Sequence, residues 1–340
     1  MTEPSQFNDL GVRGAMLHDE PMAKHVSWRA GGVAAHVIRP ADLADLIAFL
    51  RLTPPDEAIV FVGLGSNLLV RDGGFAGTVV FTHGVLDRID LVQDENGATL
   101  LTAEAGVAAP KVSRFAARHD LIGTEFMAGI PGTVGGALAM NAGCYGSETW
   151  DVVAGVTTLD RHGALRERTP GEFEIGYRHV VLKDEERPNS IHPFFVAARF
   201  RLPKGDGNTS RQKIKEFLSR RIATQPLALP NAGSVFRNPP GDHAARLIEA
   251  SGLKGCTIGG AQVSLKHANF IVNLGEATAA DVVELIATVQ KSVVNATGIT
   301  LRPEVKLAGT FAPPLPAELL HLNLLPVRLG RDWKPGEASA

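Results

Sequence analysis

The feature that most constrains this chain is a glycine-rich run at residues 129–146, which reads GIPGTVGGALAMNAGCYG. Six of its eighteen residues are glycine and most of the others are small, so the run adds little side chain to a core. Glycine lets backbone N–H groups approach a ligand closely and adopts positive φ angles without strain. Successive amides can then form a concave nest of donors that suits an anion. The run favours anion binding over its structural alternative, a turn between two packed elements.

Another glycine loop, GLGSNLLVRD at residues 63–72, follows a predicted buried strand at 58–62. Because it comes earlier in the chain, it is called the first glycine loop, and the run at 129–146 is called the second. Sheets of α/β proteins bind their ligands at this end of a strand. The loop lacks the third glycine of a Rossmann fingerprint, because Leu68 stands there, and no helical pattern follows it. The chain has no GxxxxGK[ST] P-loop either. Together the two loops indicate a dinucleotide held by a different kind of fold, and a Ser/Asn turn at 66–67 is the alternative.

Composition narrows the class of protein. The 340 residues predict two or three domains, and 44% hydrophobic with 21% charged residues is typical of a soluble globular protein. A net charge of −2 offers no basic surface for nucleic acid. No apolar run approaches the ~20 residues of a membrane helix, and the N-terminus does not read as a secretory signal. The expected location is the cytoplasm, which also suits two cysteines that lie far apart in sequence.

The spacing of apolar residues predicts a mixture of helices and strands. A strand at 33–38, a helix at 41–51 and the strand at 58–62 form a predicted βαβ unit. Further predicted elements are strands at 98–104, 152–160, 163–168, 194–202 and 301–307, helices at 111–118 and from Thr278 to Gly298, and a linker at 203–208. The three strands from 152 to 202 are predicted to belong to an antiparallel sheet. Residues 1–24 are expected to form a loosely held arm, and the proline-rich residues after 312 a poorly ordered tail.

Three polar residues outside the loops are candidates for chemistry: Arg178, Ser234 and Glu304. Each has a structural alternative, because arginine is commonly a surface ion-pair residue and a serine beside a glycine is typical of a turn. Glu304 alternates with Arg302 and Lys306, which is the pattern of a solvated face and by itself outweighs a catalytic role. The 11 histidines show no metal-ligand spacing, so no metal site is expected. The residues alone indicate an α/β protein that binds a phosphorylated ligand.

At these residues the chain resembles the UDP-N-acetylenolpyruvoylglucosamine reductase family, flavoenzymes usually called MurB. The resemblance rests on blocks that follow the family's order within residues 22–311, and several of them are long enough to be highly specific. The blocks are GLGSNLLV at 63–70, AGIPGTVGGALAMNAGCYGSE at 128–148, GYR at 176–178, QPLALPNAGSVFRNP at 225–239, KHANFIVN at 266–273 and LRPEVKLAG at 301–309.

The resemblance implies an α+β fold of three domains. Two α+β subdomains form a FAD-binding unit of the vanillyl-alcohol-oxidase/PCMH-like kind, and a C-terminal α+β domain binds the substrate. The implied division is an N-terminal arm at 1–24, FAD-binding subdomains at 25–85 and 86–204, a substrate-binding domain at 205–311 and a tail at 312–340.

The resemblance also implies roles for individual residues. Arg178, Ser234 and Glu304 match the family's catalytic arginine, serine and glutamate. Tyr177, Arg221 and Asn238 match positions that engage the UDP-sugar. The residues expected to surround the FAD are Gly63, Gly65, Ser66, Asn67, Leu68, Gly129, Pro131, Gly132, Thr133, Gly135, Gly136, Asn141 and Gly143.

The implied reaction is the NADPH-dependent reduction of UDP-N-acetylglucosamine enolpyruvate to UDP-N-acetylmuramate, a step in the synthesis of peptidoglycan precursors. FAD takes hydride from NADPH and delivers it to C3 of the enolpyruvyl ether. Arg178 and Glu304 then stabilise the negative charge that develops from C2, and Ser234 protonates C2. Alternatives are a FAD-dependent oxidase of the same superfold, acting on a sugar or alcohol, and a nucleotide-sugar sensor without catalysis. The intact catalytic blocks argue against both.

The chain departs from the family pattern at a few positions. Val180 stands where the usual Tyr-Arg-x-Ser motif has a serine, so a hydroxyl there is either not required or supplied elsewhere. The chain has only two tyrosines, Tyr145 and Tyr177, and so resembles the branch that lacks a tyrosine-bearing lid. Within the glycine-rich run, we expect Gly135 to let the backbone approach the cofactor.

Overall fold

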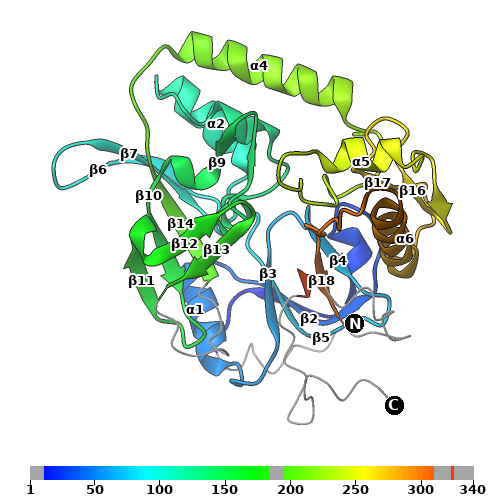
Figure 1. Ribbon diagram of the computed structural model, residues 1–340. Coiled ribbons are helices and arrows are strands. Elements are labelled where there is room, and N and C mark those ends of the chain that lie inside the picture. Colours follow the sequence, from blue (N-terminus) through cyan, green and yellow to red (C-terminus); the bar gives the residue numbers. More distant parts are fainter. Residues whose placement is uncertain (1–10, 184–193, 310–322, 325–340) are drawn as a thin grey trace.

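The computed structural model describes residues 11–183, 194–309 and 323–324 (Figure 1). Its strands form several separate sheets, and helices lie between them in the chain. The α+β class that the family resemblance implied is therefore confirmed. No helix in this described part of the chain has the length and hydrophobicity of a membrane span.

The first sheet has four strands in the order β1-β2-β5-β3. They are β1 (Ala15–Pro21), β2 (Val33–Arg39), β5 (Phe75–Phe81) and β3 (Ile59–Val62). Both β2 and β3 pair in parallel with β5, and β1 pairs with β2 in antiparallel. Helix α1 (Leu43–Leu52) connects β2 to β3, and the Asp42 carboxylate caps its first turn. The predicted βαβ unit is confirmed, with β5 inserted between its two strands.

The expectation of a loosely held arm at 1–24 is wrong for residues 15–24. Strand β1 is registered along β2 from Ala15 to Pro21, and a 3-10 helix, η2 (Met22–Lys24), follows it. Met22 is fully buried in the core of the first sheet. An edge strand with one solvent face carries many polar residues, so its sequence does not read as a strand. Residues 1–10 lie outside the described residues.

The second sheet has five antiparallel strands in the order β11-β10-β14-β7-β6, as the spacing of the strands from 152 to 202 predicted. Helices α2 (Ala109–Arg118) and α3 (Val134–Ala139) share a buried core with it. The strands are β11 (Leu165–Arg168), β10 (Val153–Leu159), β14 (Phe194–Arg201), β7 (Thr99–Glu104) and β6 (Ile89–Gln93). Smaller elements nearby are η3 (Glu125–Gly129), β8 (Gly143–Cys144), β9 (Ser147–Glu148), η4 (Thr149–Asp151), η5 (Pro170–Glu172), β12 (Phe173–Gly176) and β13 (His179–Leu182).

The C-terminal part is built around α6 (Ala279–Thr297), whose apolar face is buried as its spacing predicted. Thr278 and Asp281 form a capping box at its start, and Gly298 ends it at φ 72°. The other elements are α4 (Gly207–Thr224), α5 (Ala244–Ala250), β15 (Thr257–Ile258), β16 (Ala261–Val263), β17 (Ile271–Asn273) and β18 (Lys306–Ala308). Helix α4 lies over α2 and contacts η3, on the side of the second sheet (Figure 1).

The predicted strand at 301–307 is only partly correct. Leu301, Val305 and Leu307 are buried as the alternation predicted, but the ladder is confined to β18 at 306–308. Before it the chain makes an isolated antiparallel bridge from Pro303 to Phe236. A proline has no N–H to donate, so it does not continue a ladder. The tail predicted after 312 lies outside the described residues, apart from β19 (Asn323–Leu324), which pairs in parallel with β18.

Two contacts join the first sheet to the C-terminal part. Strand β4 (Leu68–Val70) pairs in parallel with β18, and Trp28 lies fully buried in the core around α6. The Trp28 indole donates to the Ile271 carbonyl at 2.8 Å. The Asp72 carboxylate, just after β4, accepts from the first two amides of α6, those of Ala279 and Ala280, at 3.0 and 2.7 Å. The first glycine loop is therefore tied to helix α6 through Asp72.

Asp72→Ala is expected to lower the free energy of unfolding by about 1 kcal/mol, because α6 loses a carboxylate from its positive end. The midpoint of urea unfolding measures the loss. Glu276→Ala is the matched control, since Glu276 is an exposed acid just before the same helix. Equal losses in the two variants would show that Asp72 acts only through overall charge.

Candidate active site

The two glycine loops lie against each other. A Cβ atom added to Gly63 would lie 2.7 Å from the Thr133 Cγ2, and one added to Gly132 would lie 3.4 Å from the Ser66 Oγ. A side chain at Gly63 would therefore displace the second loop, so glycine is required there for the two backbones to approach. The structure thus brings together two loops that have the 56 residues 73–128 between them in sequence.

The tip of the first loop presents backbone donors that the chain leaves open. Among the described residues no acceptor is recorded for the amides of Leu64, Gly65, Ser66 and Asn67. Gly65 adopts φ 60°, and a Cβ there would lie 2.9 Å from the Val26 Cα. Consecutive open amides in a tight loop form a nest that suits phosphate oxygens. The loop fits the pyrophosphate of a dinucleotide.

Gly135 and Gly136 play different parts in α3. A Cβ at Gly135 would lie 3.0 Å from the Ala105 Cβ, and the Gly135 amide already donates to the Ala105 carbonyl at 2.9 Å. The missing side chain of Gly135 makes room for Ala105, the residue after β7, and the expectation that the Gly135 backbone approaches the cofactor stays a prediction. A Cβ at Gly136 would meet only the Thr133 Oγ1, at 3.9 Å, and Gly136 is exposed.

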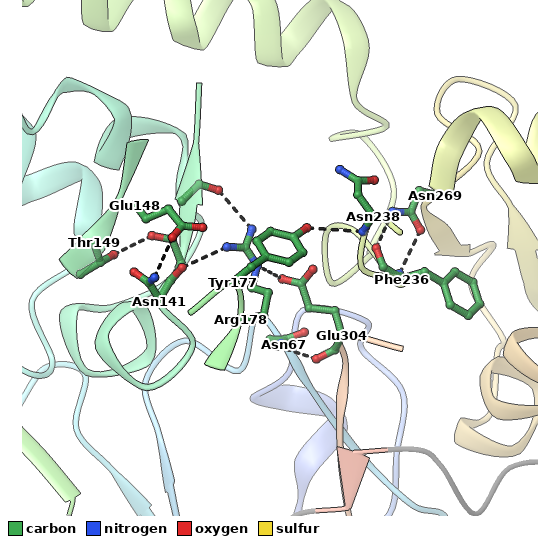
Figure 2. A network of polar contacts seen from close by, with 12 residues as sticks. Asn67, Asn141, Glu148, Thr149, Tyr177, Arg178, Phe236, Asn238, Asn269 and Glu304 are labelled. Atoms are coloured by element: carbon green, nitrogen blue, oxygen red, sulfur yellow. Dashed lines mark hydrogen bonds and ion pairs between the residues drawn. The ribbon is translucent and has the colours of Figure 1, made fainter. Parts of the chain in front are cut away.

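Arg178 and Glu304 form an ion pair between the two halves of the molecule (Figure 2). The Arg178 Nε donates to the Glu304 Oε1 at 2.6 Å, and the two side chains are only 13% and 14% exposed. The other guanidinium nitrogens donate to the carbonyls of Asn141, at 3.0 Å, and Gly143, at 3.2 Å. Arg178 itself adopts φ 56°, an uncommon conformation for a residue with a side chain. The arginine is held at a fixed place by the glycine-rich run.

Asn141 organises the end of that run (Figure 2). Its side-chain amide donates to the Glu148 Oε2 at 2.7 Å and to the Gly176 carbonyl at 3.2 Å. Its Oδ1 accepts from the Trp150 amide at 3.1 Å. Asn141 is buried and adopts φ 40°. The Asn141 side chain therefore helps to position Arg178. It holds Asn141, whose carbonyl accepts from the guanidinium, and it holds Gly176, which lies two residues before Arg178.

Burial raises the pKa of the Glu304 carboxyl, and the cations Arg178 and Arg237 only partly oppose this. The alternation with Arg302 and Lys306 predicted a solvated face, and this prediction is wrong for Glu304. Its segment is covered by the first glycine loop, where the Asn67 side chain donates to the Glu304 carbonyl at 3.2 Å. Only tertiary packing shows this burial, since the local pattern is that of a surface strand.

Ser234 is next in sequence to Val235, which is hydrogen-bonded to the backbone of Glu304. The Glu304 amide donates at 2.7 Å to the carbonyl of Val235, the residue after Ser234, and Phe236 bridges Pro303. The Asn269 side chain fixes the same turn, by accepting from the Phe236 amide and donating to its carbonyl (Figure 2). The structure thus brings all three candidate catalytic residues to one place.

The residues expected to engage the substrate surround this place. The Asn238 amide donates to the Tyr177 hydroxyl at 3.5 Å, and the Asn238 Oδ1 accepts from the Ala244 amide at 3.1 Å. Arg221, on α4, lines a cavity of about 360 Å³ together with Ser66, Pro131 and the segment 227–233. This cavity joins the tips of both glycine loops to the turn that carries Ser234.

Cys144 and Val180 are packing residues. Burial raises the pKa of the Cys144 thiol to about 11, and the thiol donates to the Phe126 carbonyl at 3.1 Å. A neutral, hydrogen-bonded thiol is a poor nucleophile. Val180, on β13, packs against the core of the second sheet. Among the described residues no group of three or more His, Cys, Asp or Glu side chains is placed to hold a metal.

Two residues of the site escaped the sequence analysis. Glu148 orients Asn141, and an acidic residue at the end of a glycine-rich run has no local pattern that indicates this role. Arg237 lies three residues after Ser234, and its guanidinium acts on the pKa of Glu304. A single arginine in a loop gives no periodic or spacing signal, so only the fold indicates its importance.

Two family models match the chain. One, described as a FAD binding domain, matches residues 34–168. The other, described as the C-terminal domain of UDP-N-acetylenolpyruvoylglucosamine reductase, matches residues 225–308.

Similar proteins cover nearly the whole chain. A UDP-N-acetylenolpyruvoylglucosamine reductase of Thiobacillus denitrificans is 58% identical over 307 residues, which cover 88% of this chain and 93% of the relative. One of Nitrosospira multiformis is 56% identical over 89% of this chain and 91% of its own. The crystal structure of the Thermus caldophilus enzyme matches with a TM-score of 0.71 at 30% identity, covering 87% of this chain and 99% of that one. The chain belongs to the UDP-N-acetylenolpyruvoylglucosamine reductase family.

Proposed function

We propose that this protein uses NADPH and FAD to reduce UDP-N-acetylglucosamine enolpyruvate to UDP-N-acetylmuramate, for peptidoglycan precursor synthesis. The observation that carries the proposal is the buried Arg178–Glu304 pair beside Ser234, at the meeting point of two glycine loops. Similarity to reductases of this name along nearly the whole chain supports the same reaction.

The glycine loops fit FAD. The open amides of residues 64–67 suit its pyrophosphate, and the close approach of Gly63 to Thr133 leaves a continuous backbone surface beside them. The matched FAD-binding model spans both loops. When bound, the flavin accepts hydride from NADPH and donates hydride to the enolpyruvyl ether.

Arg178 and Glu304 are suited to stabilise the negative charge that develops when C3 of the ether receives hydride. The charge spreads from C2 into the substrate carboxylate, and preorganised donors for such charge are typically worth about 3–4 kcal/mol each. The guanidinium of Arg178 is held by two carbonyls, so it does not need to reorganise during the reaction. The raised pKa of Glu304 favours its protonated form, and a protonated carboxyl is suited to donate a hydrogen bond to the forming enolate.

Ser234 is the proposed proton donor to C2. A hydroxyl is normally a weak acid, but an enolate carbon is basic enough to take its proton. Tyr177, Arg221 and Asn238 are the proposed contacts of the UDP-sugar. Tyr177 and Asn238 contact each other close to the Ser234 turn, and Arg221 lines the cavity beside it. The proposed boundary between the FAD-binding subdomains and the substrate-binding domain lies at residue 205. The cytoplasm is the proposed location, because the reaction uses NADPH and a nucleotide sugar.

Ser234→Ala is expected to leave flavin reduction by NADPH near its normal rate, because the hydroxyl has no part in that step. Reoxidation by the enolpyruvyl sugar is expected to fall by about 10² to 10⁴, the loss typical of a positioned general acid. Ser234→Cys should recover part of the rate, since a thiol is the stronger acid. Stopped-flow absorbance of the flavin measures both steps. Equal slowing of both half-reactions would make Ser234 a structural residue.

Turnover is expected to fall as the pH rises through the pKa of Glu304, which burial places above that of an ordinary glutamate. The protonated carboxyl is the form that donates a hydrogen bond, and it is lost above this pKa. Glu304→Gln should remove this limb of the pH profile, since an amide does not titrate but still donates. Glu304→Ala should cost about 10²–10³ in turnover. A pH profile with the same limb in Glu304→Gln would assign it to another group.

Gly136→Val is expected to weaken FAD binding by about tenfold to a hundredfold, as a clash of about 1–3 kcal/mol would produce. Its stability should change little, because the new side chain meets no packed neighbour. Gly135→Val should show the opposite behaviour and lower the free energy of unfolding, because it clashes with Ala105. Flavin titration of the apoprotein and thermal unfolding distinguish the two. Full flavin affinity in Gly136→Val would exclude that face of α3 from the cofactor site.

A further inference from the structure

The hairpin that ends the second glycine loop carries a tyrosine in an unusual backbone conformation. Its strands β8 and β9 are joined by only two residues, Tyr145 and Gly146, and Cys144 pairs with Ser147 across the turn. Both turn residues lie in the left-handed region, with φ 57° and φ 88° respectively. Such a turn favours asparagine, aspartate or glycine, and a bulky residue at positive φ is an outlier. The conformation therefore points to a role for the tyrosine side chain.

The Tyr145 side chain docks on helix α4. Its ring is stacked on the ring of Phe217, with ring centroids 4.1 Å apart and an angle of 9° between the planes. Its hydroxyl donates to the Phe217 carbonyl at 2.8 Å. The start of the second glycine loop leaves room for the ring, because a Cβ added to Gly129 would lie 2.7 Å from the Tyr145 Cε2. The ring therefore joins the loop to the helix.

Helix α4 is anchored differently along its length. Its first half is held by a buried hydrogen bond, from the Ser210 hydroxyl to the Glu125 carboxylate at 2.8 Å, and by the buried side chain of Ile214. None of the described residues 215–224 of α4 is buried. The stack on Phe217, about one turn after Ile214, therefore ties the second half of the helix to the glycine loop.

This second half of α4 carries Arg221, which lines the cavity beside the Ser234 turn. Arg221 follows Phe217 by four residues, so their side chains share one face of the helix. In an α-helix a carbonyl accepts from the amide four residues later. The Phe217 carbonyl, which the Tyr145 hydroxyl contacts, is thus also the helical partner of the Arg221 amide. A shift of the Tyr145 ring would be transmitted directly to Arg221.

The same hairpin also holds the proposed catalytic arginine. The Gly143 carbonyl, two residues before Tyr145, accepts from the Arg178 guanidinium at 3.2 Å. Residues 143–145 therefore fix Arg178 by a backbone carbonyl and Arg221 through α4. One arginine belongs to the proposed reaction centre and the other to the proposed site of the UDP-sugar. The spacing of the two depends on one short strand and its turn.

We propose that Tyr145 is a positioning residue, which docks α4 on the second glycine loop and so holds Arg221 at a fixed place relative to Arg178. This inference rests on the proposed function. The described residues that line the cavity do not include Tyr145, so its effect passes through α4. An arginine that is already in place binds the sugar nucleotide more tightly, because less of the chain has to be ordered on binding.

Tyr145→Asn tests the inference, because asparagine suits the turn but removes the ring. With FAD-loaded protein and saturating NADPH, the KM for the enolpyruvyl sugar is expected to rise about tenfold, since the aromatic stack is lost. The kcat should stay within about twofold, because Gly143 still holds Arg178. The thermal unfolding midpoint should remain near that of the wild type, since relief of the turn offsets the lost stack.

Further variants locate the effect. Phe217→Leu should raise the KM as Tyr145→Asn does, because it removes the other half of the stack. Ser219→Ala is the matched control on an exposed position of α4 and should keep the wild-type KM. Arg221→Met should raise the KM by itself, and adding Tyr145→Asn to it should raise the KM no further, because the tyrosine acts through this arginine.

An unchanged KM in Tyr145→Asn overturns the inference, and so does a double variant in which the two effects on KM multiply. A lower unfolding midpoint together with a kcat that falls as much as the KM rises would make Tyr145 a residue of the fold, which also overturns it. Failure of the proposed function looks different. It would appear in the wild type, as protein without FAD or as reduced flavin that the enolpyruvyl sugar does not reoxidise.

Discussion

The contact between Arg178 and Glu304 is the interaction on which the candidate site depends. Its partners are 126 residues apart in sequence, and they come from the turn between β12 and β13 and from the segment before β18. Each is fixed by its own backbone contacts: Arg178 by the carbonyls of Asn141 and Gly143, and Glu304 by Asn67 and Val235. Since both side chains are mostly buried, removing either one leaves an uncompensated group and disturbs the whole site.

The glycines around this ion pair serve two separate needs. Gly63 and Gly65 have no room for a side chain, because the Thr133 side chain and the backbone at His25 and Val26 lie against them. Gly135 likewise makes room for Ala105, whereas Gly136 faces open space. A glycine-rich run therefore mixes positions where a side chain would clash with the fold and positions where the missing side chain faces open space. The distinction depends on the direction of each absent Cβ, which the sequence does not contain.

Charge at the site is arranged for a ligand more than for stability. The Glu304 carboxyl is paired with Arg178 and lies within electrostatic reach of Arg237, and the surrounding packing leaves both members of the ion pair mostly buried. Such an arrangement lowers the stability of the empty protein and is retained where it serves binding or catalysis. It also accounts for the raised pKa of Glu304, since burial outweighs the attraction of its neighbours. The reduction of an anionic substrate is the kind of chemistry that this balance suits.

The sequence by itself determined most of the regular helices and strands, and its long, specific blocks of residues identified the family. The face of α6, its caps at Thr278 and Gly298, the βαβ unit and the antiparallel strands from 152 to 202 follow from local spacing. Strand β1 did not, because an edge strand with a polar face has no distinct pattern, and Pro303 shortened the last predicted strand. The burial of Glu304 and the place of Arg237 were decided only by tertiary structure. Both depend on contacts between segments that are far apart in the sequence, and the local spacing of residues does not predict such contacts.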